Sequence, residues 1–186
     1  MKRRSFLLLG AKTAAGILLA QATPVWAGIA RISGVTEEST SRTLSFYHTH
    51  TREQLDITYA IGETYNQEAL DALNLYLRDF RTAEVHPIDP ALLDILWTIQ
   101  QKMGCTSCYE VISGYRSPAT NSQLRSKSKG VAKRSLHMQG MAIDVRLTGQ
   151  QTNELRDCAI SLKAGGVGYY AASDFVHIDT GRVRTW

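Results

Sequence analysis

Two short segments carry side chains that could bind a metal ion. The first runs from Ser135 to Asp144 and contains His137, and the second runs from Phe175 to Asp179 and contains His177. Two imidazoles and one carboxylate are a common ligand set of catalytic zinc sites, which keep one coordination position open for water or substrate. This combination indicates hydrolysis rather than binding alone.

The local sequence suggests how these ligands converge. His137 lies in an expected loop, Gly140 allows a sharp turn, and Asp144 lies on the strand that follows. His177 and Asp179 occupy alternate positions of a later strand and therefore share a face. His177 would be the third ligand, and Asp179 would reach the site or orient a ligand imidazole. The alternative is that His137 is an ordinary loop residue and His177 a hydrogen-bonded core residue.

The surrounding sequence alternates between strand and helix patterns. Thr43 to Ala60 reads as a β-hairpin, and helix starts are marked by Asn66, by Asp89 before Pro90, and by Ser117 before Pro118. The two helices between residues 66 and 104 should cover one face of a sheet. The order of elements favours an α+β domain with a mainly antiparallel sheet. Expected helices span residues 66–81, 89–104, 117–129 and 152–163, and further strands span 109–113, 141–147, 167–170 and 175–179.

The N-terminal segment has the pattern of a targeting sequence. Paired arginines, Arg3 and Arg4, precede an apolar run to Ala20 and a small-residue cleavage site near Ala27. We therefore expect a twin-arginine-type signal peptide over residues 1–27, a linker over 28–42 and a zinc-binding catalytic domain over 43–186. An uncleaved membrane anchor is the alternative, but Lys12 interrupts a run already short of the ~20 apolar residues of a span.

The charge of the chain changes once this segment is set aside. Four of the 21 Lys and Arg residues lie in residues 1–27, which contain no Asp or Glu, so 17 basic residues remain against 17 acidic ones. The apparent pI near 9.0 is thus a property of the targeting segment. It gives no support to nucleic-acid binding.

The chain contains three cysteines, an odd number that cannot form a complete disulfide framework. Cys105 and Cys108 have the spacing of a redox motif or of half a structural zinc site, but no second pair follows. A local disulfide or two small buried residues are the simpler interpretations. Cys158 lies in a helical pattern and reads as a core thiol.

His48 and His50 form a second histidine pair on one face of the expected hairpin. Because the segment offers no third ligand, an exposed strand is the favoured interpretation.

The first metal-binding segment resembles a known family of zinc peptidases. Its pattern is Ser-x-His-x-x-Gly-x-Ala-x-Asp, followed by the late His177. This is similar to the zinc D-Ala-D-Ala carboxypeptidases and dipeptidases that share a fold with hedgehog proteins. Residues from about 40 to 186, with Ile-Ser-Gly-Tyr-Arg-Ser at 112–117, Gly-Gly-Val-Gly-Tyr-Tyr at 165–170 and the C-terminal Trp186, look still more like the exported murein endopeptidase K family.

The resemblance implies a hedgehog/DD-peptidase-like fold and a role for particular residues. His137, Asp144 and His177 would bind zinc, and Arg116 would point into the cleft. There Arg116 would stabilise the developing oxyanion or hold a substrate carboxylate.

The general base is the point where the chain departs from the family pattern. Relatives of the dipeptidase type carry a Glu three residues before the last His, where this chain has Asp174. Either Asp174 acts from a shifted backbone, or Asp179 takes the role, or another group does. Asp179 is slightly preferred because it shares a face with His177.

Together these features predict an exported, zinc-dependent murein endopeptidase of the periplasm. Its substrate would be peptidoglycan, with hydrolysis of L,D-type 3-3 or D,D-type 4-3 cross-links, and its export partner the twin-arginine machinery. No stable membrane insertion is expected after signal cleavage. A D-Ala carboxypeptidase and a non-catalytic, zinc-containing peptidoglycan-binding module are the alternatives.

Overall fold

The computed structural model describes residues 40–128 and 130–186. The expected signal peptide, residues 1–27, lies outside the described residues, as does most of the expected linker, residues 28–42. Within the described part of the chain, no helix combines the length and the apolar character needed to cross a bilayer.

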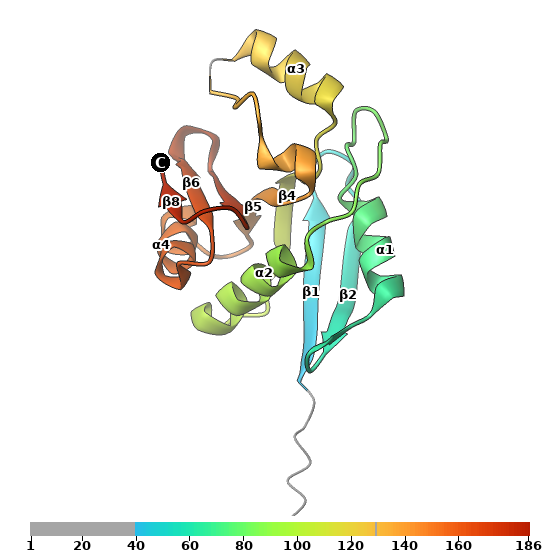
Figure 1. Ribbon diagram of the computed structural model, residues 1–186. Helices are drawn as coiled ribbons and strands as arrows, with labels where there is room; N and C mark the ends of the chain where they lie inside the picture. Colours follow the sequence, from blue (N-terminus) through green and yellow to red (C-terminus); the bar gives the residue numbers. More distant parts are fainter. Residues whose placement is uncertain (1–39, 129) are drawn as a thin grey trace, which may run out of the picture. The chain divides into compact units, whose positions relative to one another are not determined.

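An eight-stranded sheet runs through the described residues in the order β3-β2-β1-β4-β5-β7-β6-β8 (Figure 1). The β1–β4 and β6–β8 pairs are parallel and the other pairs are antiparallel. This confirms the predicted α+β class with a mainly antiparallel sheet. The strands are β1 Ser41–His48, β2 Gln54–Ile61, β3 Thr64–Tyr65, β4 Tyr109–Ser113, β5 Ala142–Leu147, β6 Gly166–Tyr170, β7 Phe175–Asp179 and β8 Arg184–Thr185.

Three of the helices, α1 Gln67–Tyr76, α2 Pro90–Met103 and α4 Thr152–Leu162, pack on the sheet. Their apolar faces supply Leu73, Leu96 and Leu155 to one hydrophobic core, where they meet inward-facing strand residues. Ile143 and Val145 of β5 and Val176 and Ile178 of β7 belong to this core. Because side chains alternate across a strand, Asp144 and His177 project from the opposite face.

The helix starts follow the predicted caps. The side chains of Asn66, Asp89 and Ser117 each accept a backbone N–H in the first turn of α1, α2 and α3 Pro118–Lys127. Gly104 ends α2 in the left-handed conformation.

The first helix is five residues shorter than predicted, because it ends at Tyr76 rather than near Arg81. The backbone oxygen of Leu77 accepts the N–H of Tyr115, and the Asp79 carboxylate accepts the N–H groups of Arg81 and Ser117. These contacts draw the chain away from the helix axis. They also fix the segment that carries Arg116.

Two short strands were not predicted from the sequence, β3 and β8. Each has two residues and exists only through pairing with a neighbour, β2 or β6. The predicted exposed strand at His48 is wrong, because His48 ends β1 with none of its surface exposed. All three cysteines are free thiols of intermediate burial, and Cys105 and Cys158 pack against the core.

Candidate metal centre

His137 lies in a short 3-10 helix, η1 Leu136–Gln139, that is locked between two other elements. Gly140 ends this helix in the left-handed conformation, and its backbone oxygen accepts the N–H of Asp89 at the start of α2. The N–H of Thr180, after β7, binds the oxygen of Met141. A side chain at Gly140 would place its Cβ 2.0 Å from the backbone oxygen of Pro87. The position therefore requires glycine for both conformation and space.

Asp144 and His177 are directly opposite each other in the antiparallel β5–β7 pair. Their side chains leave the same face of the sheet, and both are more than nine-tenths buried. Neighbouring residues opposite each other across two strands bring their side chains within contact distance. The sheet register thus places two of the three ligands, and the η1 turn brings the third.

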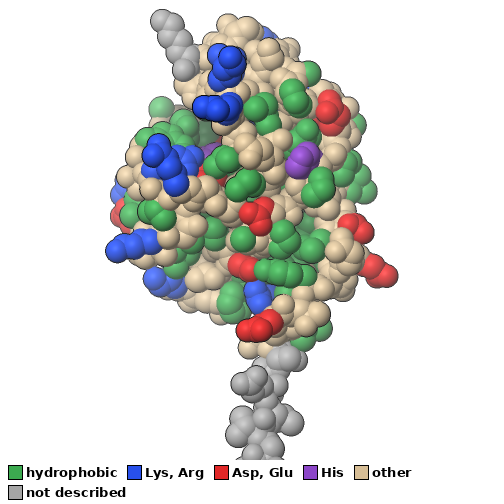
Figure 2. Space-filling view, in the orientation of Figure 1, with side chains coloured by type: hydrophobic (Ala, Val, Ile, Leu, Met, Phe, Trp, Pro, Cys, Tyr) green, Lys and Arg blue, Asp and Glu red, His purple; other side chains and the backbone are tan. Residues whose placement is uncertain are grey.

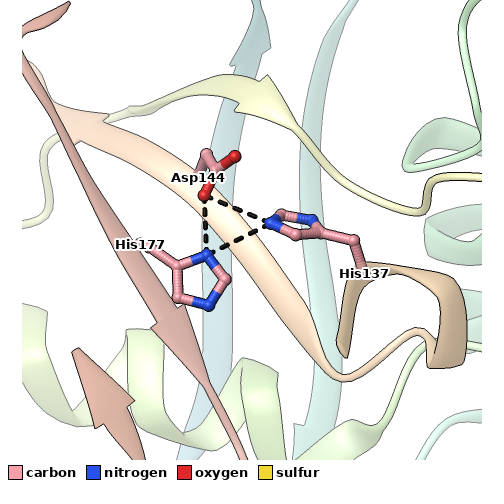
Figure 3. Close-up of side chains that lie close together, drawn as sticks. All are labelled: His137, Asp144 and His177. Carbon is pink, nitrogen blue, oxygen red and sulfur yellow. Dashed lines mark hydrogen bonds and ion pairs between the residues drawn. The ribbon is translucent and has the colours of Figure 1, made fainter. Parts of the chain in front are cut away.

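The three side chains converge on one point (Figure 3). Nδ1 of His177 lies 2.8 Å from Oδ1 of Asp144, Nε2 of His137 lies 3.2 Å from the same oxygen, and the two nitrogens are 3.1 Å apart. Within the described residues, these three form the group of His, Cys, Asp and Glu side chains close enough to hold one ion.

The outer nitrogens of both imidazoles already have acceptors. Nδ1 of His137 donates to the backbone oxygen of Gly114 at 2.7 Å, and Nε2 of His177 donates to Oδ2 of Asp179 at 3.0 Å. A neutral imidazole carries only one N–H, so the inner nitrogens present lone pairs to one another and to the Asp144 carboxylate. Three lone-pair donors facing one point are stabilised by a positive charge there, either a proton on an imidazole or a metal ion. Two nitrogens, one carboxylate oxygen and acceptors behind both imidazoles fit zinc.

The electrostatics of the site agree with a positive charge at this point. Burial lowers the pKa of His177, but hydrogen bonds to Asp144 and Asp179 outweigh burial and raise the pKa to about 9. For His137 burial dominates, and its pKa falls below the usual value. Burial opposes ionisation of Asp144, yet contacts with His137 and His177 hold its pKa well below the usual range. The pocket keeps one negative charge and favours one positive charge beside it.

Asp179 lies behind His177 rather than beside the open face of the site. None of its side-chain surface is exposed. Besides His177, its oxygens accept the backbone N–H groups of Gly166 and Gly181 and both terminal nitrogens of Arg184. Burial opposes its ionisation, but these partners hold its pKa below the usual range.

Asp174 lies at the far end of β7 from Asp179, in a left-handed conformation after the short helix η2 Ala171–Ser173. Its carboxylate accepts hydrogen bonds from Thr152 and Arg146 and is mostly exposed. The side chain therefore contacts the start of α4, not the candidate metal ligands.

Arg116 lies beside the group of candidate ligands. Its Nη2 is 3.5 Å from Oδ2 of Asp144 and 3.3 Å from Oγ of Ser113. Its Nε is buried without a partner. Burial lowers the pKa of Arg116, with Asp144 opposing the shift. The backbone N–H of Arg116 binds the oxygen of His137, so the two residues are positioned together.

A cavity of about 390 Å³ opens over this group. Arg116, Arg134 and Arg184 line it, whereas Asp144 is its one acidic lining residue among the described residues. Figure 2 shows most Lys and Arg side chains toward the α3 and α4 side of the face in view, whereas acidic side chains lie over its centre and toward α1. The full lining is Arg116, Ser128, Gly130, Val131, Ala132, Arg134, Ser135, Leu136, His137, Asp144, Tyr170, Phe175, His177, Arg184 and Trp186.

The sequence did not identify Arg184 as a residue that lines the site. The available signal was the two-residue alternation that places Arg184 and Trp186 on one face of an extended segment. Because β8 has only two residues, that segment was not recognised as a strand.

Comparisons with known proteins show the family of the chain. The sequence profile of the Peptidase_M15_2 family, described as peptidoglycan L,D-endopeptidase MepK, matches residues 36–186. The peptidoglycan L,D-endopeptidase MepK of Escherichia coli strain K12 is 44% identical over 145 residues, which cover 78% of this chain and 80% of that protein. The probable peptidoglycan L,D-endopeptidase MepK of Haemophilus influenzae is 42% identical over 146 residues, with 78% of each chain covered.

Proposed function

The chain belongs to the Peptidase_M15_2 family, and we propose that it is an exported, zinc-dependent endopeptidase that hydrolyses peptide cross-links of peptidoglycan. The observation that carries the proposal is the group of three inward-facing ligand atoms at the base of an open, cationic cavity. Buried structural metal sites have four protein ligands, whereas three ligands below a cavity leave a position for water or substrate.

His137, Asp144 and His177 would hold the zinc ion. When bound, zinc lowers the pKa of a coordinated water toward ~7 and polarises the scissile carbonyl. Asp144 contributes one oxygen to the ligand group, and its other oxygen faces Arg116.

Arg116 has the free donor that the reaction requires. Its buried Nε has no protein partner, and its guanidinium lies next to the ligand group. A donor fixed at this place stabilises negative charge that develops on a carbonyl oxygen. We assign this role to Arg116, with binding of a substrate carboxylate as the second option.

Asp179 would act as the acceptor that orients His177, not as the base. A general base must come within ~2.6–3.2 Å of the proton that it removes. Each oxygen of Asp179 is already occupied, and its side chain has no exposed surface. Asp174 is bound by Thr152 and Arg146. Activation of water would then depend mainly on the metal.

The cationic lining suits the substrate. Stem peptides of peptidoglycan carry free carboxylates, and Arg134 and Arg184 bring positive charge to the wall of the cavity. The names of the relatives favour the L,D-type 3-3 cross-link over the D,D-type 4-3 cross-link.

Cross-linked muropeptides provide the direct test. The full-length protein with zinc is incubated separately with 3-3 and 4-3 linked dimers, and the products are identified by mass spectrometry. Matched variants are His177→Ala, which removes a ligand, and His50→Ala, which changes an exposed histidine outside the site.

The outcomes separate the candidate functions. Conversion of dimers to monomers by the wild type and His50→Ala, but not by His177→Ala or after chelation, supports the endopeptidase, and the dimer consumed identifies the bond. Release of single D-Ala residues would indicate a carboxypeptidase. Intact dimers despite bound zinc would indicate a binding module.

Export through the twin-arginine machinery to the periplasm is proposed from residues 1–27. Replacing Arg3 and Arg4 by lysine should leave the protein in the cytoplasmic fraction of cells. A periplasmic product of unchanged amount would contradict this route.

A further inference from the structure

Both terminal nitrogens of Arg184 donate hydrogen bonds to the carboxylate of Asp179. Nη1 lies 3.0 Å from Oδ1, and Nη2 lies 2.7 Å from Oδ2. Paired contacts of this kind fix the plane of the carboxylate as well as its position. The Oδ2 atom that receives Nη2 is also the acceptor for Nε2 of His177. Arg184 is therefore one hydrogen-bonded residue removed from a metal-ligand imidazole.

Arg184 is itself held in place by Trp186. Its guanidinium carbon lies 4.8 Å from the centre of the indole ring, and Nη1 also donates to the backbone oxygen of Arg182. The indole nitrogen of Trp186 donates to the hydroxyl of Tyr170 at 3.0 Å. The ring centre of Trp186 lies 5.3 Å from that of His177.

The backbone beside β6 fixes Trp186 in turn. Its N–H binds the oxygen of Val167, and its oxygen accepts the N–H of Tyr169. Glycines provide the space for this packing. A Cβ at Gly168 would lie 2.6 Å from the indole ring, and one at Gly166 would lie 2.3 Å from Nη1 of Arg184.

On the basis of the proposed zinc site, we propose that Arg184 is a positioning residue: stacked on Trp186, it fixes the Asp179 carboxylate so that Nδ1 of His177 points at the metal ion. His177, Asp179, Arg184 and Trp186 form a closed circuit of contacts. The imidazole of His177 can rotate only by breaking its bond to Asp179, and Asp179 can move only by leaving the guanidinium.

If Arg184 positions His177 through Asp179, replacing Arg184 should change the affinity of the site for metal. Residues that hold a ligand imidazole from behind typically change metal affinity by about 10–100-fold when mutated. Asp179→Asn should weaken metal affinity within that range, and Arg184→Ala, which acts one residue further out, by about ten-fold at the lower end of it. Arg184→Ala should also shift the visible absorption bands of bound Co²⁺, because the ligand geometry changes. Arg184→Lys keeps the charge but loses the paired contact, so its affinity should lie between those of the alanine variant and the wild type.

The chain offers a matched control in Arg156. Its guanidinium carbon lies 4.6 Å from the ring centre of Tyr169, which belongs to strand β6. Arg156 pairs with Asp157 rather than with a site residue. Arg156→Ala removes a comparable arginine–aromatic stack at a surface. Its metal affinity and Co²⁺ spectrum should equal those of the wild type.

A double variant tests whether Arg184 acts through Asp179. If it does, adding Arg184→Ala to Asp179→Asn should weaken metal affinity little beyond Asp179→Asn alone, because coupled residues are not additive. A purely structural role of Arg184 would instead give independent losses that multiply.

The measurement is competition for Co²⁺ and Zn²⁺ against a chromophoric chelator with the full-length protein, together with thermal unfolding of each variant without metal. Unchanged affinity and spectrum in Arg184→Ala and Arg184→Lys, with metal bound by the wild type, would overturn the role of Arg184 alone. Failure of the wild type to bind metal would overturn the proposed function and this role with it. If Arg184→Ala does not fold, the folded Arg184→Lys variant decides, and wild-type affinity in it overturns the proposal.

Discussion

Nε2 of His137 faces Nδ1 of His177 at 3.1 Å, and both nitrogens face one oxygen of Asp144. The two histidines use different ring nitrogens because different acceptors hold their outer N–H groups, the backbone of Gly114 for His137 and Asp179 for His177. The acceptors behind the ring thus decide which atom of each imidazole would meet a metal ion.

This arrangement predicts a specific stabilisation by zinc. A ligand at 100 times its dissociation constant stabilises the folded state by about 2.7 kcal/mol. The wild type and His50→Asn should show a rise of this size in the free energy of unfolding. His137→Asn should show none at the same zinc concentration. The measurement is urea unfolding with and without zinc, and equal stabilisation of His137→Asn would show that zinc binds elsewhere.

Arg116 should affect catalysis without affecting metal binding. Loss of one donor to a developing oxyanion typically costs about 10²–10³-fold in kcat. Arg116→Ala should show a loss of this size on muropeptide dimers while its zinc affinity stays near that of the wild type. Arg116→Lys should lie between the two, because it keeps the charge but not the planar donors.

A rise in KM with unchanged kcat in both Arg116 variants would instead assign the residue to substrate carboxylate binding. Zinc affinity that falls together with kcat would mean that Arg116 mainly holds Asp144 in place.

Replacement by alanine should lower the free energy of unfolding more at Gly140 than at Gly149, although both glycines have positive φ, +66° and +78°. A Cβ at Gly149 meets nothing within 4 Å, so Gly149→Ala should cost only the left-handed conformation, about 1–2 kcal/mol. At Gly140 the Cβ would meet the backbone of Pro87, which adds about 1–3 kcal/mol of overpacking. Urea unfolding measures both variants, and equal losses would contradict the close approach of Pro87.

The elements whose ends depend on local chemistry could be predicted from the sequence. A capping side chain such as Asn66, or Asp89 before Pro90, acts within its own first turn, so three helix starts were predicted correctly. The end of α1 could not be predicted, because it depends on contacts of Leu77 and Asp79 with residues near 115 that are distant in sequence.

In the candidate site too, features set by nearby residues could be predicted, and features set by contacts distant in sequence could not. The pattern of His137, Gly140 and Asp144 is local, and strand alternation correctly placed His177 and Asp179 on one face. Alternation does not say what fills the space around a carboxylate. The N–H groups of Gly166 and Gly181 and the guanidinium of Arg184 enclose Asp179, and these come from β6, from the turn after β7 and from β8.

His48 predicts a pH dependence of stability. Burial, with repulsion from His50, lowers its pKa to about 4 from about 6.5 in the unfolded chain. Above pH 6.5 both states are neutral, and between pH 6.5 and 4 only the unfolded state gains the proton. The free energy of unfolding should therefore fall as the pH falls through this interval, by up to about 3 kcal/mol.

His48→Asn isolates this contribution. Nδ1 of His48 accepts the backbone N–H groups of His50 and Thr51, and an asparagine oxygen can accept them without titrating. Other groups, including His137, titrate in both proteins and cancel in the difference. Urea unfolding at pH 4 to 7 should give a flatter profile for the variant, and parallel profiles would contradict the low pKa.

The last prediction concerns the place of the missing glutamate. Asp174 occupies the position where dipeptidase-type relatives carry their base, but its carboxylate binds Thr152 and Arg146. Because this carboxylate is mostly exposed and contacts no residue of the His137, Asp144 and His177 group, Asp174→Ala should retain most of the wild-type kcat on muropeptide dimers at saturating zinc. A loss of kcat by orders of magnitude with unchanged zinc affinity would identify Asp174 as the base, and would require its side chain to leave Thr152 when substrate binds. Retained activity would mean that water is activated without this carboxylate, by a metal ion that His137, Asp144 and His177 would hold, with Arg116 beside Asp144.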